Sequence, residues 1–258
     1  MSDDELATWW STAIVDILPG VIRYRGYPVE ELIGRVGFVD MIALLVLGDL
    51  PDAPRRRLLE AALVASVDHG PQAPSIASAR MAATTGVGLQ GAVANGVNVL
   101  GDVHGGAGQQ AMELYLDIDA GTPVAEALAK VGPFVPGFGH RFHPVDPRVA
   151  PLLAMVEEAA AAGHIDGRFV AIGRAVEDAL ARPHRRIPMN IDGVTAVVFC
   201  ELGVPPPLGR GLFILSRAVG ILAHAWEETQ AHTRLKGPMP PAVLPRYTGP
   251  PLRHLDQR

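Results

Sequence analysis

The sequence contains a single cysteine, Cys200, so it has no pair that could form an intramolecular disulfide or supply two ligands to a zinc ion. Its 22 lysine and arginine residues are outnumbered by 27 aspartate and glutamate residues, and the formal net charge of −5 argues against nonspecific binding to nucleic acid. The nine histidines contain no His-Glu-x-x-His spacing. We therefore expect no nucleic-acid partner and no metal site, and a lone thiol suits a reducing compartment.

Long apolar runs are also missing. None approaches the roughly 20 residues that a membrane-spanning helix needs, and the longest, residues 41–47, is expected to be a buried helix. The first six residues are acidic where a secretory signal would be basic. We expect a cytoplasmic protein with no membrane partner, and its 48% of hydrophobic residues can build a substantial core.

The pattern of apolar residues predicts a largely helical protein. Apolar residues over 55–67 recur at helical spacing, and the helix is expected to stop at Gly70-Pro71. Residues 77–85 and 88–100 are rich in small residues, which lets two helices pack closely. Residues 13–28 are expected to be extended or to form a short hairpin. Further helices are expected at 28–33, 38–47, 109–117, 123–130, 147–162, 169–181, 192–202 and 211–228.

The stretch Gly101-Asp-Val-His-Gly-Gly-Ala-Gly108 places His104 between glycines, where a loop becomes a helix. Glycines let a ligand approach the backbone, and a helix N-terminus offers unpaired N–H groups and a partial positive charge. That field favours a neutral imidazole, which can donate a hydrogen bond to an enolate oxygen. The alternative is a structural turn that carries a surface histidine.

Four other places carry candidate functional groups. A loop over 132–148 is dense in proline and glycine, and such a loop in a helical protein is usually functional. Asp192 stands at the start of an apolar helix, either as its N-cap or as an acid or base. His69 ends a helix, where a protonated histidine is favoured and could pair with a carboxylate, although a simple C-cap is the alternative. Arg217 lies in an apolar helix and needs a partner, such as an anionic ligand.

Taken in order, these motifs resemble the citrate synthase superfamily, and within it the citryl-CoA lyase module that also forms the C-terminal part of ATP-citrate lyase. The segments 20–32 and 47–51 resemble the N-terminal region of citrate synthases, whereas Asp68-His-Gly-Pro71 resembles the lyase module. The short stretch between 51 and 68 also favours that module. The remaining motifs follow in the order of the family: His104-Gly-Gly, Gly137-Phe-Gly-His-Arg141, Asp146-Pro-Arg148, Asn190-Ile-Asp192 and Ser216-Arg217.

The resemblance implies a nearly all-helical homodimer, with a large domain of residues 1–105 and 201–258 and a small domain of residues 106–200 that closes over the substrates. It also implies chemistry at the carbon–carbon bond between an acetyl-CoA enolate and the ketone of oxaloacetate. By that resemblance Asp192 is the base or acid at the methyl carbon, and His104 donates to the thioester oxygen. His140 acts on the ketone oxygen and, in the cleavage direction, accepts the proton of the citryl hydroxyl group.

The same resemblance implies the binding residues. The substrate carboxylates are expected at His69, Arg148 and Arg217. Arg141 is a further candidate, for which a salt bridge within the loop is the alternative. Coenzyme A is expected as part of the substrate, not as a tightly bound cofactor, with its adenine along Val135, Pro136, Gly137, Phe138 and Gly139.

Two departures from the family pattern stand out. The loop between His140 and Asp146 is one residue shorter than in typical citrate synthases, and His143-Pro144 stands where those often carry a lysine or arginine for a CoA phosphate. Leu244 stands where relatives supply an arginine to the neighbouring subunit, and Arg246 is the candidate replacement.

Three functions stay open at this stage. The first is a citryl-CoA lyase that releases acetyl-CoA and oxaloacetate, with a citryl-CoA synthetase as a possible partner. The second is a synthase that makes citrate or 2-methylcitrate from an acyl-CoA and a 2-oxo acid. The third is a noncatalytic CoA-binding subunit, against which the presence of all three expected catalytic groups argues.

Overall fold

The computed structural model describes residues 1–182, 186–237, 242–243 and 245–254. A small antiparallel sheet near the N-terminus has the strand order β1 (Val15–Leu18), β2 (Val21–Tyr24), β3 (Tyr27–Pro28). Val15 pairs with Tyr24, and Arg23 pairs with Pro28. The hairpin expected over 13–28 is thus confirmed, with a third short strand added.

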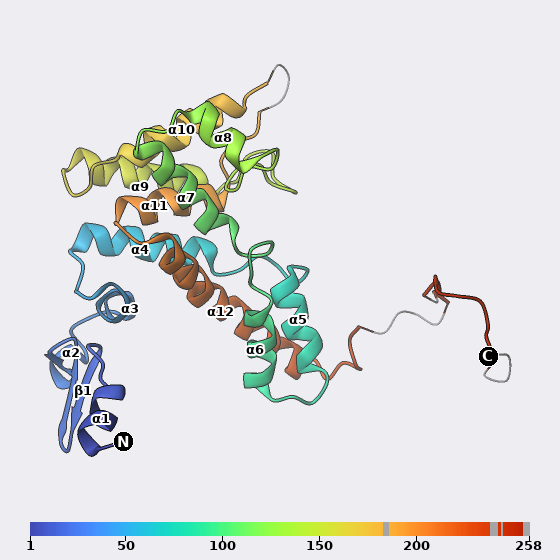
Figure 1. Cartoon of the computed structure of the whole chain (residues 1–258), viewed down its shortest axis with the longest axis horizontal. Helices are drawn as coiled ribbons and strands as arrows, with labels where there is room; N and C mark the ends of the chain where they lie inside the picture. The colour runs from blue at the N-terminus through green and yellow to red at the C-terminus, as the bar shows by residue number, and fades with distance from the viewer. Residues whose placement is uncertain (183–185, 238–241, 244, 255–258) are drawn as a thin grey trace.

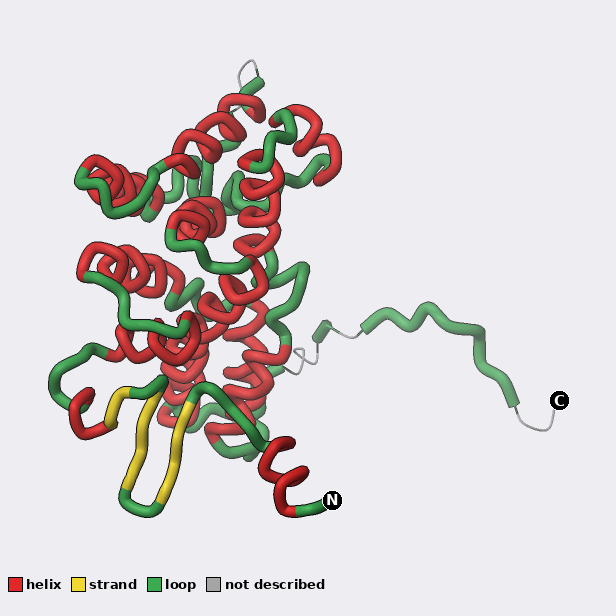
Figure 2. The backbone as a smooth tube through the Cα atoms, turned by 60° about the vertical axis from the view of Figure 1, so that its left-hand side comes forward, coloured by secondary structure: helices red, strands yellow, loops and turns green. Residues whose placement is uncertain are grey.

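Helices form most of the described chain (Figure 2), so the expected all-α class is confirmed. The first helix, α1, precedes the sheet and was not expected from the sequence. The helices are α1 (Asp3–Trp9), α2 (Val29–Leu32), α3 (Phe38–Leu47), α4 (Ala53–Ser66), α5 (Pro74–Ala83), α6 (Leu89–Asn98), α7 (Ala107–Asp119), α8 (Val124–Val131), α9 (Val149–Ala161), α10 (Arg168–Leu180), α11 (Ile191–Glu201) and α12 (Pro206–Gln230).

The long helix α12 connects two groups of helices (Figure 1): it packs against α4 and α7 toward its N-terminal end and against α5 and α6 toward its C-terminal end. By its length and composition α12 could cross a membrane, but core helices of other proteins pass the same test. The sequence analysis did not identify an apolar helix of this length. Gly220 allows α12 to approach the turn after α4, because a side chain there would collide with the carbonyl oxygen of Val67.

Two hydrophobic cores lie along α12, one toward each of its ends. The larger core surrounds α7, α10 and α11 and includes the fully buried Tyr115, Phe169 and Met112. The smaller core joins α5, α6 and α12 through Ile76 and Ile221. The expected division into residues 1–105 with 201–258 and residues 106–200 stays a prediction.

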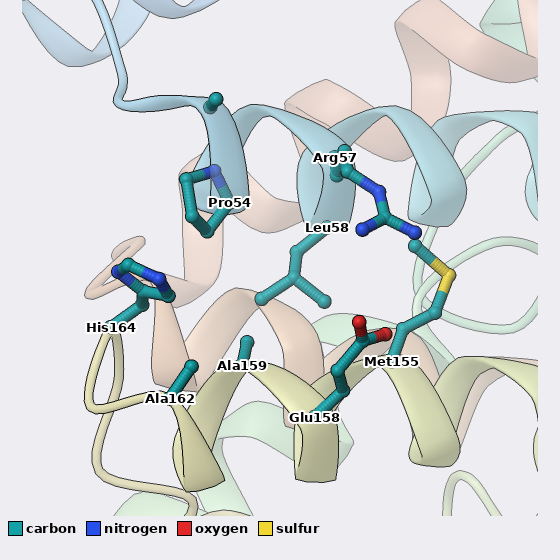
Figure 3. A pocket seen from close by; sticks show the side chains of 9 residues that line it. Pro54, Arg57, Leu58, Met155, Glu158, Ala159, Ala162 and His164 are labelled. Carbon is teal, nitrogen blue, oxygen red and sulfur yellow. The ribbon is translucent and has the colours of Figure 1, made fainter.

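Helices α4 and α9 run antiparallel, and this arrangement positions the functional loops. At one end, residues 53–58 face residues 155–164 across a cavity of about 250 Å³, in which Arg57 and Glu158 lie on opposite walls (Figure 3). At the other end, Nη1 of Arg148 donates to the carbonyl oxygen of Ala65 over 3.3 Å. The C-terminal end of α4 and the N-terminal end of α9 therefore meet where the sequence motifs lie.

Candidate active site

A cavity of about 670 Å³ brings together residues from both halves of the sequence. Six of the predicted site residues line it: His69, His104, Gly139, His140, Arg141 and Asp192. The smaller cavity between α4 and α9 (Figure 3) contains none of the predicted residues. The other lining residues of the large cavity are Gln72, Ala73, Pro74, Val103, Phe142, Asn190 and Ile191.

His104 is held by Ser75, at the start of α5. The backbone N–H of Ser75 donates to Nε2 of His104 over 3.1 Å, and the hydroxyl oxygen of Ser75 lies 3.0 Å from the same atom. A nitrogen that accepts an N–H carries no proton, so the neutral ring carries its proton on Nδ1. Burial and then the charge of Arg217 lower the pKa of His104. The expected neutral donor is thus supported, although burial rather than the helix end is the main cause.

The loop that carries His104 is fixed at both ends. The N–H of Gly101 donates to the carbonyl oxygen of His104 over 2.8 Å. The Asp102 carboxylate pairs with Arg210 of α12 over 2.7 Å. Gly105 has φ of +101°, a left-handed conformation that favours glycine. The glycines of this motif therefore shape the turn just before α7.

His140 is oriented by its own loop. Nδ1 of His140 accepts the backbone N–H groups of Phe142 and His143 over 3.1 and 3.0 Å. The neutral ring therefore carries its proton on Nε2 and is a hydrogen-bond donor at that atom. Burial lowers the pKa of His140. This geometry opposes the expected role of His140 as a proton acceptor, because Nδ1 is occupied and Nε2 already holds the hydrogen.

Asp192 lies in the first turn of α11, but it is not the N-cap. Asn190 is the N-cap, and its Oδ1 accepts the N–H groups of Asp192 over 2.9 Å and of Gly193 over 3.3 Å. The capping alternative for Asp192 is therefore wrong. Burial raises the pKa of Asp192, against the opposing charges of Arg217 and Arg148. A raised pKa is what a carboxyl group needs in order to give up a proton near neutral pH.

Arg148 is fixed by Asp146, a residue to which the sequence analysis gave no role. Nε and Nη2 of Arg148 donate to the two carboxylate oxygens of Asp146 over 2.9 and 2.8 Å. The buried Asp146 also accepts the N–H of Ile191 over 3.0 Å, and these donors hold its pKa at about 2. The only sequence signal is the motif itself, in which Asp146 precedes Arg148 by two positions. One carboxylate thus connects the arginine to the helix of Asp192.

Arg217 is a buried cation beside the cavity. Its Nε donates to the carbonyl oxygen of Ser66 over 3.1 Å, and its guanidinium group lies 4.9 Å from the ring centre of Phe213. Within the described residues no carboxylate comes within ion-pair distance of it. A buried charge without a carboxylate partner is costly, which is the property expected of an anion-binding arginine.

His69 lies directly after α4, and its ring centre is 6.0 Å from that of His140. Burial, Arg217 and Arg148 all lower the pKa of His69. Burial and the two arginines thus oppose the protonated state expected from the helix end, which stays a prediction. The preceding residue, Asp68, accepts the N–H of Gly70 over 3.1 Å and lies 3.3 Å from Nε2 of His224.

The remaining predicted residues are less well placed to contact a ligand in the cavity. Arg141 is exposed at the cavity and forms no ion pair among the described residues, so a salt bridge within its loop is not found. Of residues 135–139, Gly139 alone is among the lining residues. Its N–H donates to Pro188 over 2.7 Å, and its carbonyl oxygen accepts Nδ2 of Asn190 over 2.6 Å. Coenzyme A binding at 135–139 stays a prediction.

The remaining basic residues of interest are Arg186 and, in the C-terminal tail, Arg246. The N–H of Gly139 donates to the carbonyl oxygen of Pro188, so Arg186 stands two positions from a residue that is bonded to the segment predicted to bind coenzyme A. The sequence analysis gave this arginine no role. Leu244 lies outside the described residues, and Arg246 is exposed in a segment that extends away from the helices (Figure 1).

The sequence and the structure of this chain are both similar to those of known proteins. Residues 52–239 match the family model described as "Citrate synthase, C-terminal domain". The citrate synthase of Haloferax volcanii is 31% identical over 229 residues, which cover 86% of this chain and 57% of the relative. The chain therefore spans little more than half the length of that relative.

Two solved structures resemble the chain over nearly its whole length. The citryl-CoA lyase from Hydrogenobacter thermophilus superposes with a TM-score of 0.84 at 30% identity, covering 96% of this chain and 98% of that one. The ATP citrate lyase from Methanothrix soehngenii, in complex with citrate and coenzyme A, superposes with a TM-score of 0.79 at 20% identity, covering 96% of this chain and 44% of that one. The second likeness concerns the fold alone.

Proposed function

Because the chain belongs to the citrate synthase family, we propose that it is an enzyme that cleaves citryl-CoA to acetyl-CoA and oxaloacetate. The observation that carries this proposal is one cavity in which His104, His140 and Asp192 meet. The likeness to a citryl-CoA lyase over 98% of that protein's length supports the lyase above the longer citrate synthases.

Each of the three groups suits one part of the cleavage. As the carbon–carbon bond breaks, its electron pair moves into the thioester and forms an enolate, whose oxygen receives a hydrogen bond from Nδ1–H of His104. Asp192, whose pKa is raised by burial, gives a proton to the enolate carbon and so forms the methyl group. The hydroxyl-bearing carbon becomes a ketone, whose oxygen receives a hydrogen bond from Nε2–H of His140.

The arginines suit the anionic part of the substrate. A citryl group presents carboxylates, which guanidinium groups bind well. Arg217 supplies a buried charge, and Arg148 is held rigidly by Asp146. The cavity is lined by residues of both predicted domains: His69 and His104 belong to the predicted large domain, and His140 and Asp192 to the predicted small domain. We therefore propose that the substrate binds between the two domains and that they close over it.

Coenzyme A enters and leaves as part of the substrate and product, so the proposal needs no tightly bound cofactor. Its adenine is proposed to lie along residues 135–139. Because His143-Pro144 offers no lysine or arginine for a phosphate, Arg186 is proposed to supply that charge. A citryl-CoA synthetase would supply the substrate, and the single cysteine suits the cytoplasmic location that we propose.

We also propose that the enzyme is a homodimer. Leu215, Val219, Leu222 and Trp226 recur every three or four residues along α12, so they form one stripe on this helix. They are between 41% and 58% exposed in the single chain. Exposed apolar stripes of this kind mark protein interfaces, and a second copy would bury both stripes against each other.

The test is a product analysis by mass spectrometry. Purified protein receives citryl-CoA in one reaction and acetyl-CoA with oxaloacetate in another. Acetyl-CoA and oxaloacetate from the first, with little free citrate from the second, are the result expected of a lyase. Rapid formation of citrate and free CoA in the second reaction would overturn the lyase in favour of a synthase, which the likeness to citrate synthases favours as the second candidate.

A further inference from the structure

The cavity between α4 and α9 has no part in the proposed reaction. It has a volume of about 250 Å³ and lies at one end of the two helices, whereas Ala65 and Arg148 meet at the other end. Pockets that hold drug-sized ligands usually measure about 300–1,000 Å³. This second cavity therefore suits a molecule smaller than a drug.

The floor of this cavity is apolar. Leu58 of α4 is 1% exposed and Ala159 of α9 is 8% exposed. Figure 3 shows Pro54 and Ala162 beyond them, at the end of the cavity away from Arg57. Removing apolar surface from water is favourable, so this floor provides a place for an aliphatic or aromatic group of a ligand.

Two opposite charges stand above this floor. Figure 3 shows Arg57 on α4 and Glu158 on α9, with their charged ends directed toward each other across the cavity. Their neighbours Arg55, Arg56 and Glu157 each pair with a residue of opposite charge. Within the part of the chain that the structure describes, Arg57 and Glu158 form no ion pair. A ligand that carries both a carboxylate and an ammonium group can therefore bridge the two walls.

We infer that this cavity binds a small apolar α-amino acid. The α-carboxylate pairs with the guanidinium group of Arg57, and the α-ammonium group pairs with the carboxylate of Glu158. The side chain of the ligand lies on Leu58 and Ala159. A fatty acid would leave Glu158 without a partner, and an aliphatic amine would leave Arg57 without one. An apolar amino acid satisfies both walls and the floor together.

The amino acid should also inhibit the cleavage of citryl-CoA, and this part of the inference rests on the proposed function. Helix α4 belongs to the predicted large domain and α9 to the predicted small domain, and their other ends meet near the active site. A ligand that contacts both helices favours the arrangement that it fits. Closure of the domains over the substrate would disturb these contacts, so KM for citryl-CoA should rise when the amino acid is bound.

The experiment is isothermal titration of the full chain with L-leucine, L-methionine and L-phenylalanine as probes. The tightest of the three is then compared with analogues; for L-leucine these are isocaproate, isoamylamine and glycine. Isocaproate lacks the ammonium group, isoamylamine lacks the carboxylate, and glycine lacks the apolar side chain. Each analogue should bind about tenfold or more weakly than the amino acid, because each loses one of the three sets of contacts.

Variants locate the binding site. Arg57→Met and Glu158→Gln remove one charge each and should weaken binding about tenfold or more. Ala162→Leu fills the cavity and should abolish binding. Arg55→Met and Glu157→Gln are the matched controls, because they remove a charge from the same helices outside the cavity and should bind like wild type. All five positions are exposed, so the variants should fold.

The outcomes are separable. Failure of all three amino acids to bind, or equal affinities in wild type, Arg57→Met and Glu158→Gln, would overturn the site. Binding that leaves KM for citryl-CoA unchanged would overturn the inhibition. If the wild type fails to cleave citryl-CoA, the proposed function fails and the inhibition falls with it, while the titrations still decide whether the cavity binds an amino acid.

Discussion

Asp192 combines a raised pKa with a proposed proton transfer, so one substitution affects stability and turnover in opposite ways. Asp192→Asn cannot transfer a proton, and we expect turnover of citryl-CoA to fall by about 10²–10⁴-fold. Binding of coenzyme A should persist, because no binding group is removed. Isothermal titration with coenzyme A and the product analysis check both points, and turnover by the variant at the wild-type rate would contradict the role of Asp192.

Asp192→Asn also tests why the pKa of Asp192 is raised. Folding raises the pKa of Asp192 above 3.8, so the folded protein binds an extra proton between 3.8 and that raised pKa. Stability therefore falls as the pH rises through this window and stays lower above it. Asp192→Asn removes this penalty and should melt at the same temperature as wild type or higher at neutral pH. A clearly lower Tm would show that the carboxylate is a favourable partner in the fold.

The pKa of Asp146 is shifted in the opposite direction, below its ordinary value. Its pKa of about 2 lies below the ordinary 3.8, so its stabilising effect is present above 3.8 and is lost as the pH falls towards 2. Breaking a buried pair costs about 3–5 kcal/mol, and we expect the lower end for Asp146→Asn because Arg148 is partly exposed. Urea unfolding at neutral pH measures the loss, and KM for citryl-CoA should rise as Arg148 loses its anchor.

The matched control for Asp146→Asn is Asp166→Asn. Asp166 also pairs with an arginine two positions away, Arg168, over 2.9 Å, but both side chains are mostly exposed. An exposed pair contributes at most about 1 kcal/mol. Similar losses in the two variants would contradict the view that Asp146 acts as a buried anchor.

At the residue scale, the sequence identified the groups of the cavity but not their protonation. His69, His104, His140 and Asp192 were all named from motifs, and all four line one cavity. Their proton positions depend on contacts distant in sequence: Ser75 is 29 positions from His104. Burial and then Arg217, which stands on a different helix, lower the pKa of His69. Local rules about helix ends do not include such contacts, and for His69 these contacts oppose the state that the helix end favours.

At the scale of elements, the residue that caps the N-terminus of α11, Asn190, also positions Asp192. Asn190 caps α11 with Oδ1 and donates from Nδ2 to the carbonyl oxygen of Gly139. Asn190→Ala should lower the free energy of unfolding by about 1–2 kcal/mol and also lower kcat. Asn190→Asp keeps a capping oxygen but loses the Nδ2 donor, so its loss of stability should be smaller.

Urea unfolding of both variants checks this prediction, with Ser2→Ala as the control. Ser2 caps α1, where its hydroxyl oxygen accepts the N–H of Glu5, but α1 buries no residue and lies far from the cavity. Removing this cap should leave kcat unchanged. A loss of activity in Ser2→Ala that equals that of Asn190→Ala would contradict a specific role for the α11 cap.

Most elements followed from the spacing of apolar residues, and the errors lie at their ends. Residues 38–47 were expected as a helix and form α3 with those bounds. The helix expected from 77 starts instead at Pro74, because proline is favoured in the first turn of a helix. That shift matters for function, since it puts the N–H of Ser75 in the first turn, free to donate to His104. α1 was missed because it has no apolar face that packs on the core.

At the scale of the whole molecule, the family and the all-α fold followed from the order of the motifs, whereas the assembly did not. Only packing reveals which residues of an apolar helix stay exposed, and α12 is buried on the sides that meet α4, α5, α6 and α7. The stripe of Leu215, Val219, Leu222 and Trp226 appears once those neighbours are in place. The sequence alone could not separate this stripe from the rest of the helix.

The exposed apolar stripe on α12 allows a direct test of the proposed homodimer. Light scattering should give wild type a molar mass of twice 27.3 kDa. Val219→Asp puts a charge at the centre of the stripe, where burial in a dimer would be costly. Because Val219 is exposed in the single chain, the variant should stay folded and give one times that mass. Val64→Asp is the control, since Val64 is an exposed valine on α4 and lies outside the stripe. A monomeric wild type, or Val219→Asp with the wild-type mass, would contradict an interface on this face of α12.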